Sequence, residues 1–251
     1  MRGLAILCLL AAVGCAGGDD DDGGGGGGGG GGDDGGDGDS ATDGAPPIAC
    51  DDEPEHAGEG TYYDADGTGN CSFDASPDDL MVAAMNQVDY DDSAACGACA
   101  AVDGPAGSVT VRIVDRCPEC PQGDLDLSPQ AFEQIAELSA GRVPIAWRYV
   151  ACEVDGPVSF HFKDGTNPFW TAIQVRDHRF AVASLEARLV GGDWTPIARE
   201  NYNYFVQADG LGEGPFDLRV TDVHGEAIEN IDIVPDENVT VAGDGQFPAC
   251  E

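Results

Sequence analysis

Residues 111–132 read VRIVDRCPECPQGDLDLSPQAF and combine a strand, a cysteine-rich loop and a helix start. Apolar residues at every second position from 109 to 113 predict a half-buried strand that ends at Asp115. Ser128-Pro129 predicts a helix start, because Ser is a favoured N-cap residue and Pro a favoured first helical residue. The carboxylates of Asp115 and Asp126 therefore flank one tight loop. Such a pair suits a sugar-binding cleft, and it equally suits an ordinary capped turn.

The predicted helix is short. Phe132, Ile135 and Leu138 would form its apolar stripe.

Residues 1–15 are predicted to be a lipoprotein signal peptide. Arg2 precedes an apolar run, Leu4 to Val13, that is too short for a permanent membrane span. The sequence Ala12-Val13-Gly14-Cys15 resembles a bacterial lipobox, so Cys15 is the predicted lipidation site. A plain secretory signal is the alternative.

Residues 16–55 are predicted to be a disordered leash. The stretch 16–46 is dominated by Gly and Asp and offers almost no apolar side chains to bury. A lipid at Cys15 followed by this leash predicts an exported protein at the bacterial cell envelope or surface. The membrane would be contacted through the lipid alone, and release from the surface is an alternative.

The charge balance restricts the partners. The formal net charge is −36, with 47 acidic and 11 basic residues, and Lys163 is the single lysine. Nucleic acid is excluded as a partner because phosphate binding needs a basic stripe. Anionic polymers are disfavoured, whereas neutral glycans fit. The acidity could also reflect a salty habitat, in which ions screen charge repulsion.

The cysteines allow two interpretations. Two of the ten, Cys8 and Cys15, belong to the signal segment, which leaves eight: Cys50, Cys71, Cys96, Cys99, Cys117, Cys120, Cys152 and Cys250. An even set in an exported chain indicates disulfides. The two C-x-x-C pairs also have the spacing of a four-cysteine zinc ribbon, and a redox role is a further alternative. The export signal favours disulfides.

Two domains follow the leash. Residues 56–152 contain short strand-like runs and one helix, and about ninety residues can bury a modest core that disulfides would support. Residues 153–251 contain short alternating runs at regular spacing, separated by loops rich in Gly, Asp and Pro. The runs that predict strands are 158–163, 172–175, 185–190, 203–206, 218–220 and 228–233. This pattern is typical of a β-sandwich. Gly156-Pro157 leaves almost no linker, so we expect the two domains to have a fixed relation.

Segments in both domains resemble the microbial expansins. They include GTY at 60–62, DLMVAAMN at 79–86, VTVRIVDRCPEC at 109–120, GDLDLSPQAF at 123–132, VPIAWRYV at 143–150, WTAIQVRDHRF at 170–180, NYNYFV at 201–206 and QFP at 246–248. The resemblance covers residues 58–249. It implies a mainly β protein, with a six-stranded double-psi β-barrel at 56–152 and an immunoglobulin-like β-sandwich, a family-63 carbohydrate-binding domain, at 153–251. It also implies a monomer without a cofactor.

The resemblance implies a polar cleft in the barrel, formed by Thr61, Asp115 and Asp126. Expansins carry an aromatic residue two positions after the first of these acids, and this chain has Cys117 there. A stacking surface is therefore absent from that position.

The second domain of expansins presents aromatic residues to cellulose, and the matching positions are Phe169, Trp170 and Tyr202, with Lys163 nearby. Sugar rings stack on aromatic faces, so a row of such rings suits a flat glucan chain. Packing in the core is the alternative for these residues. For Trp147 and Trp194 packing is the prediction.

Glycoside hydrolysis normally takes two carboxylates with separate roles. Related barrel endoglucanases place the acid at the position of Asp126 and take the base from an early Asp, where this chain has Thr61. The resemblance therefore implies loosening of cellulose-type β-glucan without hydrolysis. Burial and acidic neighbours are expected to raise the pKa of Asp126.

Two other functions stay open. The barrel is shared with rare lipoprotein A, so a lytic transglycosylase acting on peptidoglycan is one alternative. A glycan-binding surface lipoprotein without loosening activity is the other, and xylan is a further candidate ligand.

The pattern in plant expansins implies the disulfides Cys71–Cys96 and Cys99–Cys152. Elimination then pairs Cys117 with Cys120 and Cys50 with Cys250. No metal site is expected, because the four histidines have no metal-ligand spacing.

Overall fold

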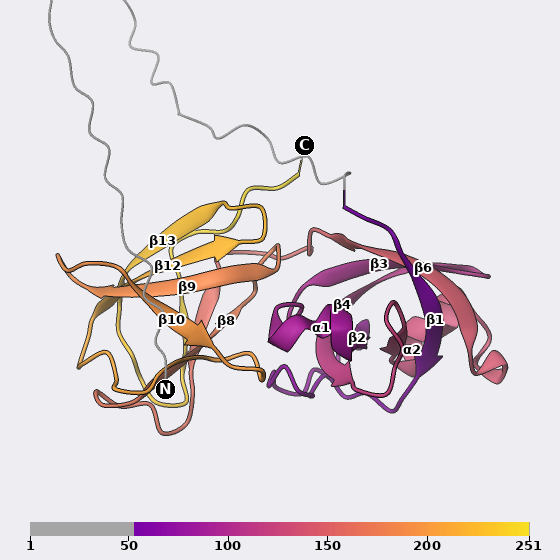
Figure 1. The fold of residues 1–251 in the computed structure, drawn as a ribbon, viewed down its shortest axis with the longest axis horizontal. Helices are drawn as coiled ribbons and strands as arrows, with labels where there is room; N and C mark the ends of the chain where they lie inside the picture. Colours follow the sequence, from indigo (N-terminus) through magenta and orange to yellow (C-terminus); the bar gives the residue numbers. More distant parts are fainter. Residues whose placement is uncertain (1–52, 251) are drawn as a thin grey trace, which may run out of the picture. The chain divides into compact units, whose positions relative to one another are not determined.

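The computed structural model describes residues 53–250, in which β-structure dominates (Figure 1). Six strands close a barrel: β1 (His56–Tyr62), β2 (Val82–Asn86), β3 (Cys99–Gly104), β4 (Gly107–Cys117), β5 (Leu125–Leu127) and β6 (Val143–Val150). Their order around the barrel is β1-β5-β2-β4-β3-β6. β1 pairs with β5 and β2 with β4 in parallel, and the other pairs are antiparallel. The predicted mainly β fold with a six-stranded barrel is confirmed. The strand predicted to end at Asp115 continues to Cys117.

Two short α-helices accompany the barrel, α1 (Gln87–Tyr90) and α2 (Pro129–Ile135), with 3₁₀ segments at Asp91–Ser93 and Leu138–Ala140. α2 begins as predicted, with the Ser128 side chain accepting a hydrogen bond from the Ala131 N–H. The prediction that the helix includes Leu138 is wrong. The backbone is already extended at Ala136, and the Ile135 carbonyl accepts from the Ala106 N–H at 2.9 Å.

The barrel core fixes which way the acids point. Leu125 and Leu127 of β5 are fully buried together with Phe132, Ile135 and Trp147. Because successive side chains of a strand point to opposite faces, Asp126 faces outward.

Eight further strands form one continuous hydrogen-bonded sheet in the order β13-β12-β9-β10-β11-β8-β7-β14. They are β7 (Ser159–Phe162), β8 (Thr171–Arg176), β9 (Val182–Leu189), β10 (Thr195–Arg199), β11 (Phe205–Gln207), β12 (Phe216–Asp222), β13 (Ala227–Ile233) and β14 (Thr240–Ala242). Of these, β10 and β14 were not predicted.

β10 joins the two halves of this sheet. It pairs with β9 through Thr195–Ile197 and with β11 through Ala198 and Arg199. Phe160 and Ile173 from one half and Leu185 and Leu218 from the other share one buried core, as expected for a β-sandwich.

The described residues belong to one compact unit, and hydrogen bonds join the barrel to the second sheet. Gln174 Nε2 donates to the Cys71 carbonyl at 2.8 Å, and Ser93 Oγ donates to the Glu200 carbonyl at 2.8 Å. Both side chains are fully buried. The segment between β6 and β7 contains the predicted domain boundary at 152/153.

Three predicted disulfides are confirmed: Cys71–Cys96, Cys99–Cys152 and Cys117–Cys120. The zinc-ribbon alternative is wrong, because all four C-x-x-C sulfurs are bonded to other sulfurs. Cys250 is also disulfide-bonded. Its predicted partner Cys50 lies outside the described residues, so that pair stays a prediction.

The signal peptide 1–15, the lipidation site Cys15 and the leash up to residue 52 also lie outside the described residues. Among residues 53–250, none of the helices has the length and apolar character needed to cross a bilayer.

Candidate functional site

Four neighbouring strands place the predicted cleft residues in one row. Thr61 of β1 is paired with Asp126 of β5, Asp126 with Ala84 of β2, and Ala84 with Asp115 of β4. Directly paired residues point to the same side of a sheet, so both acids and Thr61 share the outer face. Adjacent strands lie about 4.8 Å apart, which puts the two acidic residues about 10 Å apart. We call Thr61, Asp126 and Asp115 the acid row.

Asp126 is the acid whose surroundings favour a proton. Thr61 Oγ1 donates a hydrogen bond to Asp126 Oδ1 at 2.5 Å. Burial raises the pKa of Asp126, and the carboxylates of Glu119 and Asp115 raise it further, while the Thr61 hydroxyl and Arg142 oppose the shift. The direction agrees with the prediction from the sequence. A protonated Asp126 can donate a hydrogen bond to a sugar oxygen.

Asp115 is held by the backbone. Its Oδ1 accepts from the Asn70 N–H at 2.6 Å and from the Arg116 N–H at 2.8 Å. Gly69 leaves room for this arrangement, because a Cβ at residue 69 would lie 2.4 Å from Cβ of Asp115. Asp115 is therefore fixed by the segment that precedes Cys71.

Asn70 also links the acid row to the second sheet. Its Nδ2 donates to the Tyr90 hydroxyl at 2.7 Å and to the Asn201 carbonyl at 2.8 Å. Asn201 immediately precedes Tyr202, one of the predicted aromatic residues. A single side chain thus connects the segment that fixes Asp115 with the loop that carries Tyr202. Sequence patterns gave no signal for this role, since it depends on residues 131 positions apart.

Tyr63 is a further candidate site residue. Its N–H donates to the Leu127 carbonyl at 2.9 Å, so pairing of β1 with β5 continues past the strand end and keeps Tyr63 on the side of Thr61. Its hydroxyl is buried and has no hydrogen-bond partner among the described residues. Burial raises the pKa of Tyr63, and the nearby Asp115 and Asp126 add to the shift. The phenol is neutral, with a free donor close to both acids.

The loop after β4 shows how this chain departs from the aromatic pattern. Cys117 is buried and bonded to Cys120, which closes a loop of exposed Pro118 and Glu119. Glu119 is one of the carboxylates that raise the pKa of Asp126. The loop contributes charge to the cleft in place of a ring.

The predicted aromatic residues of the second sheet lie at its surface. Phe169 is 81% exposed, so core packing is the wrong interpretation for this ring, and Trp170 and Tyr202 are half-buried. Phe169 and Trp170 sit in a turn in which Asn167 accepts from both of their N–H groups, at 2.9 and 3.1 Å.

Strand register shows how Trp170 and Tyr202 are related across the second sheet. Gln207 pairs with Thr171 and Phe205 with Ile173, so continuing the register places Tyr204 beside Gln174. Tyr204 and Trp170 then share the face opposite the core and lie about four residues, roughly 13 Å, apart along the strands. Tyr202 extends the row beyond Tyr204, with ring centroids 5.8 Å apart.

Lys163 lies within this row. Its Nζ is 5.0 Å from the centroid of the Tyr204 ring, which is 3% exposed. The structure therefore brings Lys163 and Tyr202 together around the buried Tyr204, a residue that was not predicted, and it places Phe169 and Trp170 at the other end.

The remaining tryptophans pack, as predicted. Trp147 is 1% exposed, and its Nε1 donates to the Gly123 carbonyl at 2.8 Å. The Trp194 ring lies beneath the guanidinium groups of Arg188 and Arg219, at 4.2 and 4.5 Å. In the part of the chain that the structure describes, no cluster of three or more His, Cys, Asp or Glu residues could hold a metal ion.

Comparison with known proteins gives matches in sequence and in structure. Residues 82–147 match a domain family described as lytic transglycolase. The chain is 34% identical over 203 residues to Expansin-YoaJ of Bacillus subtilis, a match that covers 77% of this chain and 87% of that protein. It is 32% identical to Expansin-like protein 2 of Dictyostelium discoideum, of which it spans 44%.

A crystal structure of the Clavibacter michiganensis expansin has the same fold. The TM-score is 0.73 at 30% identity, covering 78% of this chain and all of the other. A mutant of that expansin in complex with cellohexaose matches equally well. With the closed barrel, the second sheet and these matches together, the chain belongs to the expansin family.

Proposed function

We propose that this expansin binds a cellulose-type β-glucan and loosens contacts between glucan chains without hydrolysing them. The absence of hydrolysis is inferred from one observation. Thr61, which donates a 2.5 Å hydrogen bond to Asp126, occupies the position where related endoglucanases have a carboxylate base. A threonine hydroxyl cannot serve as that base, and hydrolysis normally needs a second carboxylate with its own role.

The acid row and its neighbours suggest how a glucan is gripped. Asp126, with its raised pKa, can donate to a sugar oxygen, and Tyr63 offers a second buried donor with no partner in the described protein. Asp115, held by two backbone N–H groups, can accept from a sugar hydroxyl. Hydrogen bonds made here compete with those between neighbouring glucan chains. Breaking such contacts needs no covalent step.

The exposed aromatic residues supply the second part of the grip. Phe169, Trp170 and Tyr202 can stack on the apolar faces of sugar rings. The cellohexaose complex of the Clavibacter expansin supports a glucan ligand for this chain as well.

The test uses Asp126→Asn and Trp170→Ala in the full chain, with Leu189→Ala as the control for Trp170, since Leu189 is an exposed apolar residue on β9. We expect Asp126→Asn to bind cellulose normally but to lose extension of cellulose paper under load. Trp170→Ala should bind cellulose about tenfold more weakly, the loss of one stacking contact. Release of reducing sugar by the wild type, abolished by Asp126→Asn, would contradict the proposal.

The match to the lytic transglycolase family favours a second candidate, cleavage of peptidoglycan, because the matched residues include both Asp115 and Asp126. Chromatography of purified sacculi after incubation separates the two. Muropeptides with anhydro ends would establish the lytic activity, and intact sacculi would exclude it. Glycan binding with no change in wall mechanics would identify the third candidate, a surface lipoprotein that only binds.

We also propose that the protein is exported and lipid-anchored through Cys15. Metabolic labelling with a radioactive fatty acid tests this. Label in the wild type and none in Cys15→Ser is the expected result, and secretion of an unlabelled wild type would contradict it.

A further inference from the structure

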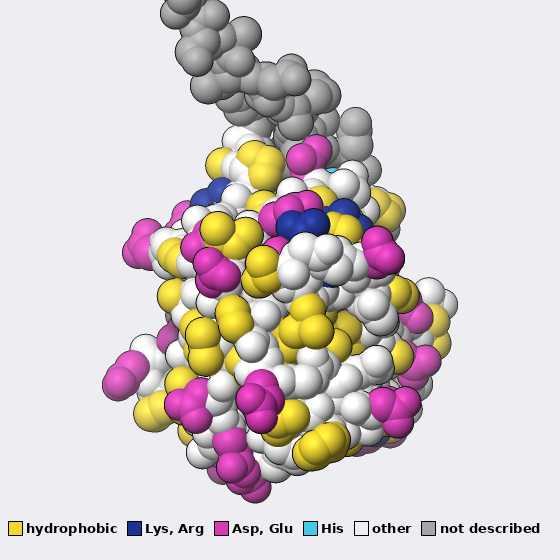
Figure 2. Space-filling model, turned by 90° about the vertical axis from the view of Figure 1, so that its left-hand side faces the viewer, with side chains coloured by type: hydrophobic (Ala, Val, Ile, Leu, Met, Phe, Trp, Pro, Cys, Tyr) yellow, Lys and Arg dark blue, Asp and Glu magenta, His cyan; other side chains and the backbone are white. Residues whose placement is uncertain are grey.

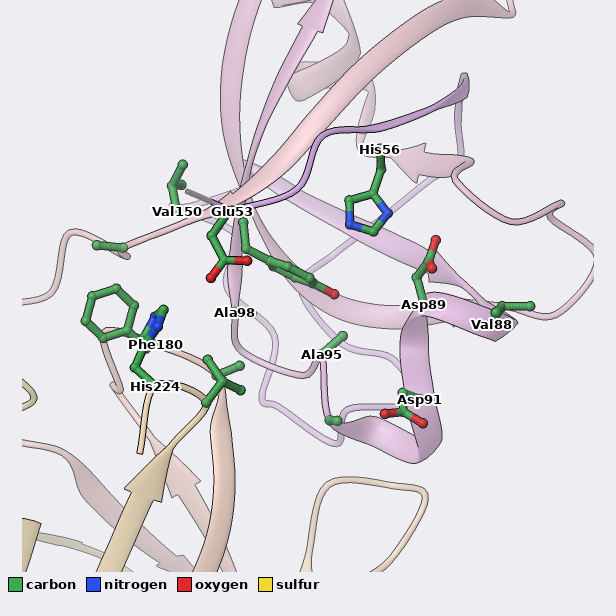
Figure 3. A pocket seen from close by; sticks show the side chains of 15 residues that line it. Glu53, His56, Val88, Asp89, Asp91, Ala95, Ala98, Val150, Phe180 and His224 are labelled. Carbon is green, nitrogen blue, oxygen red and sulfur yellow. The ribbon is translucent and has the colours of Figure 1, made fainter. Parts of the chain in front are cut away.

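A cavity separate from the glycan surface lies beside α1. Its volume is about 490 Å³, and residues of the barrel and of the second sheet line it. None of the acid row and none of Phe169, Trp170 and Tyr202 belongs to its lining. Figure 3 shows His56 and Asp89 directed toward one another on one side and Phe180 beside His224 on the other. The residues proposed to bind the glucan therefore do not explain this cavity.

Aromatic rings form the walls of the cavity. Tyr149 meets the His56 ring edge to face, with centroids 6.2 Å apart, and Phe180 meets His224 in the same way at 4.7 Å. Trp147 packs behind Tyr149 at 5.3 Å and fixes that ring. The small residues Ala95 and Ala98 leave the space between the rings open. The rings therefore offer π-faces and edges to a guest of modest size.

The charged side chains that line the cavity are all acidic. Glu53, Asp89 and Asp91 line it, and neither Lys nor Arg does. Burial is the largest cause of the raised pKa of Tyr149, and the negative charges of these three carboxylates raise it further. All three charges therefore act on the same side chain. The chain as a whole is acidic, yet a larger cavity of about 800 Å³ includes Arg112 and Arg176 in its lining. The lack of basic side chains is thus a feature of the smaller cavity itself and does not follow from the acidity of the whole chain.

Asp89, a residue of α1, is held in place by hydrogen bonds. Asp89 Oδ2 accepts from Asn86 Nδ2 at 2.7 Å and from the Gly123 N–H at 3.0 Å, and Oδ1 accepts from Gln122 at 3.3 Å. All of these donors are neutral. The Asp89 carboxylate is therefore held in place by neutral donors alone among these contacts.

We propose that this cavity binds an organic cation with an apolar body, a substituted ammonium group. A cation is attracted to the faces of aromatic rings and to the convergent carboxylates, and its alkyl groups bury against Ala95, Ala98 and the rings. A bare metal ion does not suit the site, because the described residues contain no cluster of three or more metal-ligating groups.

The test titrates the full chain with choline and with 3,3-dimethylbutan-1-ol, which has the same shape and no charge, followed by ligand-observed NMR. Choline should bind about tenfold more tightly than the alcohol, the difference that a cation–π contact and convergent carboxylates supply. Tyr149→Leu keeps apolar volume but removes the π-face, and it should reduce choline binding several-fold. Cellobiose should not compete with choline, since the glycan surface is elsewhere.

A double variant keeps the test decisive if Tyr149→Leu does not fold. Glu53→Gln with Asp91→Asn removes two charges from the rim and should also weaken choline binding. Two substitutions on distant exposed carboxylates, Glu133→Gln and Asp103→Asn, form the matched control and should leave binding unchanged. Equal binding of choline and the alcohol, or equal losses in the rim and control variants, would overturn the proposal.

Discussion

The Thr61 hydroxyl donates a hydrogen bond to Asp126 and opposes its tendency to stay protonated. Burial raises the pKa of Asp126, and the hydrogen bond from Thr61 Oγ1 lowers it. Removing that hydroxyl with Thr61→Val should therefore raise the pKa of Asp126 further. A ¹³C NMR titration of the Asp126 carboxyl group in both proteins measures the change.

Thr68→Val is the matched control for this titration. Thr68 Oγ1 makes a hydrogen bond of the same length to the exposed Asp66, a carboxylate that is not among the groups that shift the pKa of Asp126. The control should leave the Asp126 titration unchanged. An Asp126 pKa that falls in Thr61→Val would show that the hydroxyl does not stabilise the ionised form.

The buried hydroxyl of Tyr63 should lower the stability of the folded protein and strengthen its binding to cellulose. Its hydroxyl is buried without a partner in the described protein, and an unsatisfied buried donor costs about 1 to 3 kcal/mol. Tyr63→Phe is therefore expected to raise the free energy of unfolding by about 1 kcal/mol while weakening cellulose binding. Urea denaturation and a pull-down on cellulose measure the two effects. Lower stability in the variant would mean that the hydroxyl already has a partner.

At the level of elements, strong local signals predicted the fold well. Alternation found β4 and the Ser128-Pro129 cap found the start of α2, because both depend on neighbouring residues. β10 was missed because its residues Thr195–Arg199 bury only Ile197, which leaves no alternating pattern. β14 was missed for a similar reason, since its three residues are all at least partly exposed.

The candidate site was only partly predictable. Asp115 and Asp126 were singled out by the loop that they flank and Thr61 by a family resemblance, and strand register explains why the three share a face. Asn70 and Tyr204 act through contacts between distant segments, which local sequence patterns do not encode.

The disulfides differ in how much they restrict the unfolded chain. Cys99–Cys152 joins residues 53 positions apart, and Cys117–Cys120 joins residues three apart. Loop-closure entropy gives about 4 kcal/mol for the longer loop and about 2 kcal/mol for the shorter one. Replacing each pair with Ala should lower the free energy of unfolding in that order, measured by urea denaturation under oxidising conditions. A larger loss from the short pair would mean that native packing around Cys117 outweighs chain entropy.

At the scale of the whole molecule, the acidic composition shapes the surface. Figure 2 shows Asp and Glu side chains spread over one face, with only a few basic ones among them. A surface of this kind repels anionic polymers and attracts cations. This favours a neutral glucan as the ligand of the acid row and is consistent with a cation in the smaller cavity.

Stability should fall in mild acid because of a histidine where the barrel meets the second sheet. His178 is 3% exposed, its Nδ1 lies 2.8 Å from the Phe180 carbonyl, and a Cβ at Gly97 would lie 2.5 Å from its Nε2. Burial lowers the pKa of His178 from 6.5 to about 4. Between these values the unfolded chain binds a proton that the folded protein does not. Stability is therefore lost as pH falls from 6.5 to 4, by about 3 kcal/mol from this group.

Comparing variants isolates this contribution from that of the many carboxylates. His178→Asn can keep a donor to the Phe180 carbonyl and has no imidazole to protonate, so it should lower stability at neutral pH but flatten the dependence between pH 6.5 and 4. Leu189→Ala, at an exposed side chain that carries no titratable group, should keep the wild-type slope. Urea denaturation across this range provides the free energies. If His178→Asn kept the wild-type slope, the acid sensitivity would have to arise from other titrating groups, namely the carboxylates and His161, whose pKa burial also lowers.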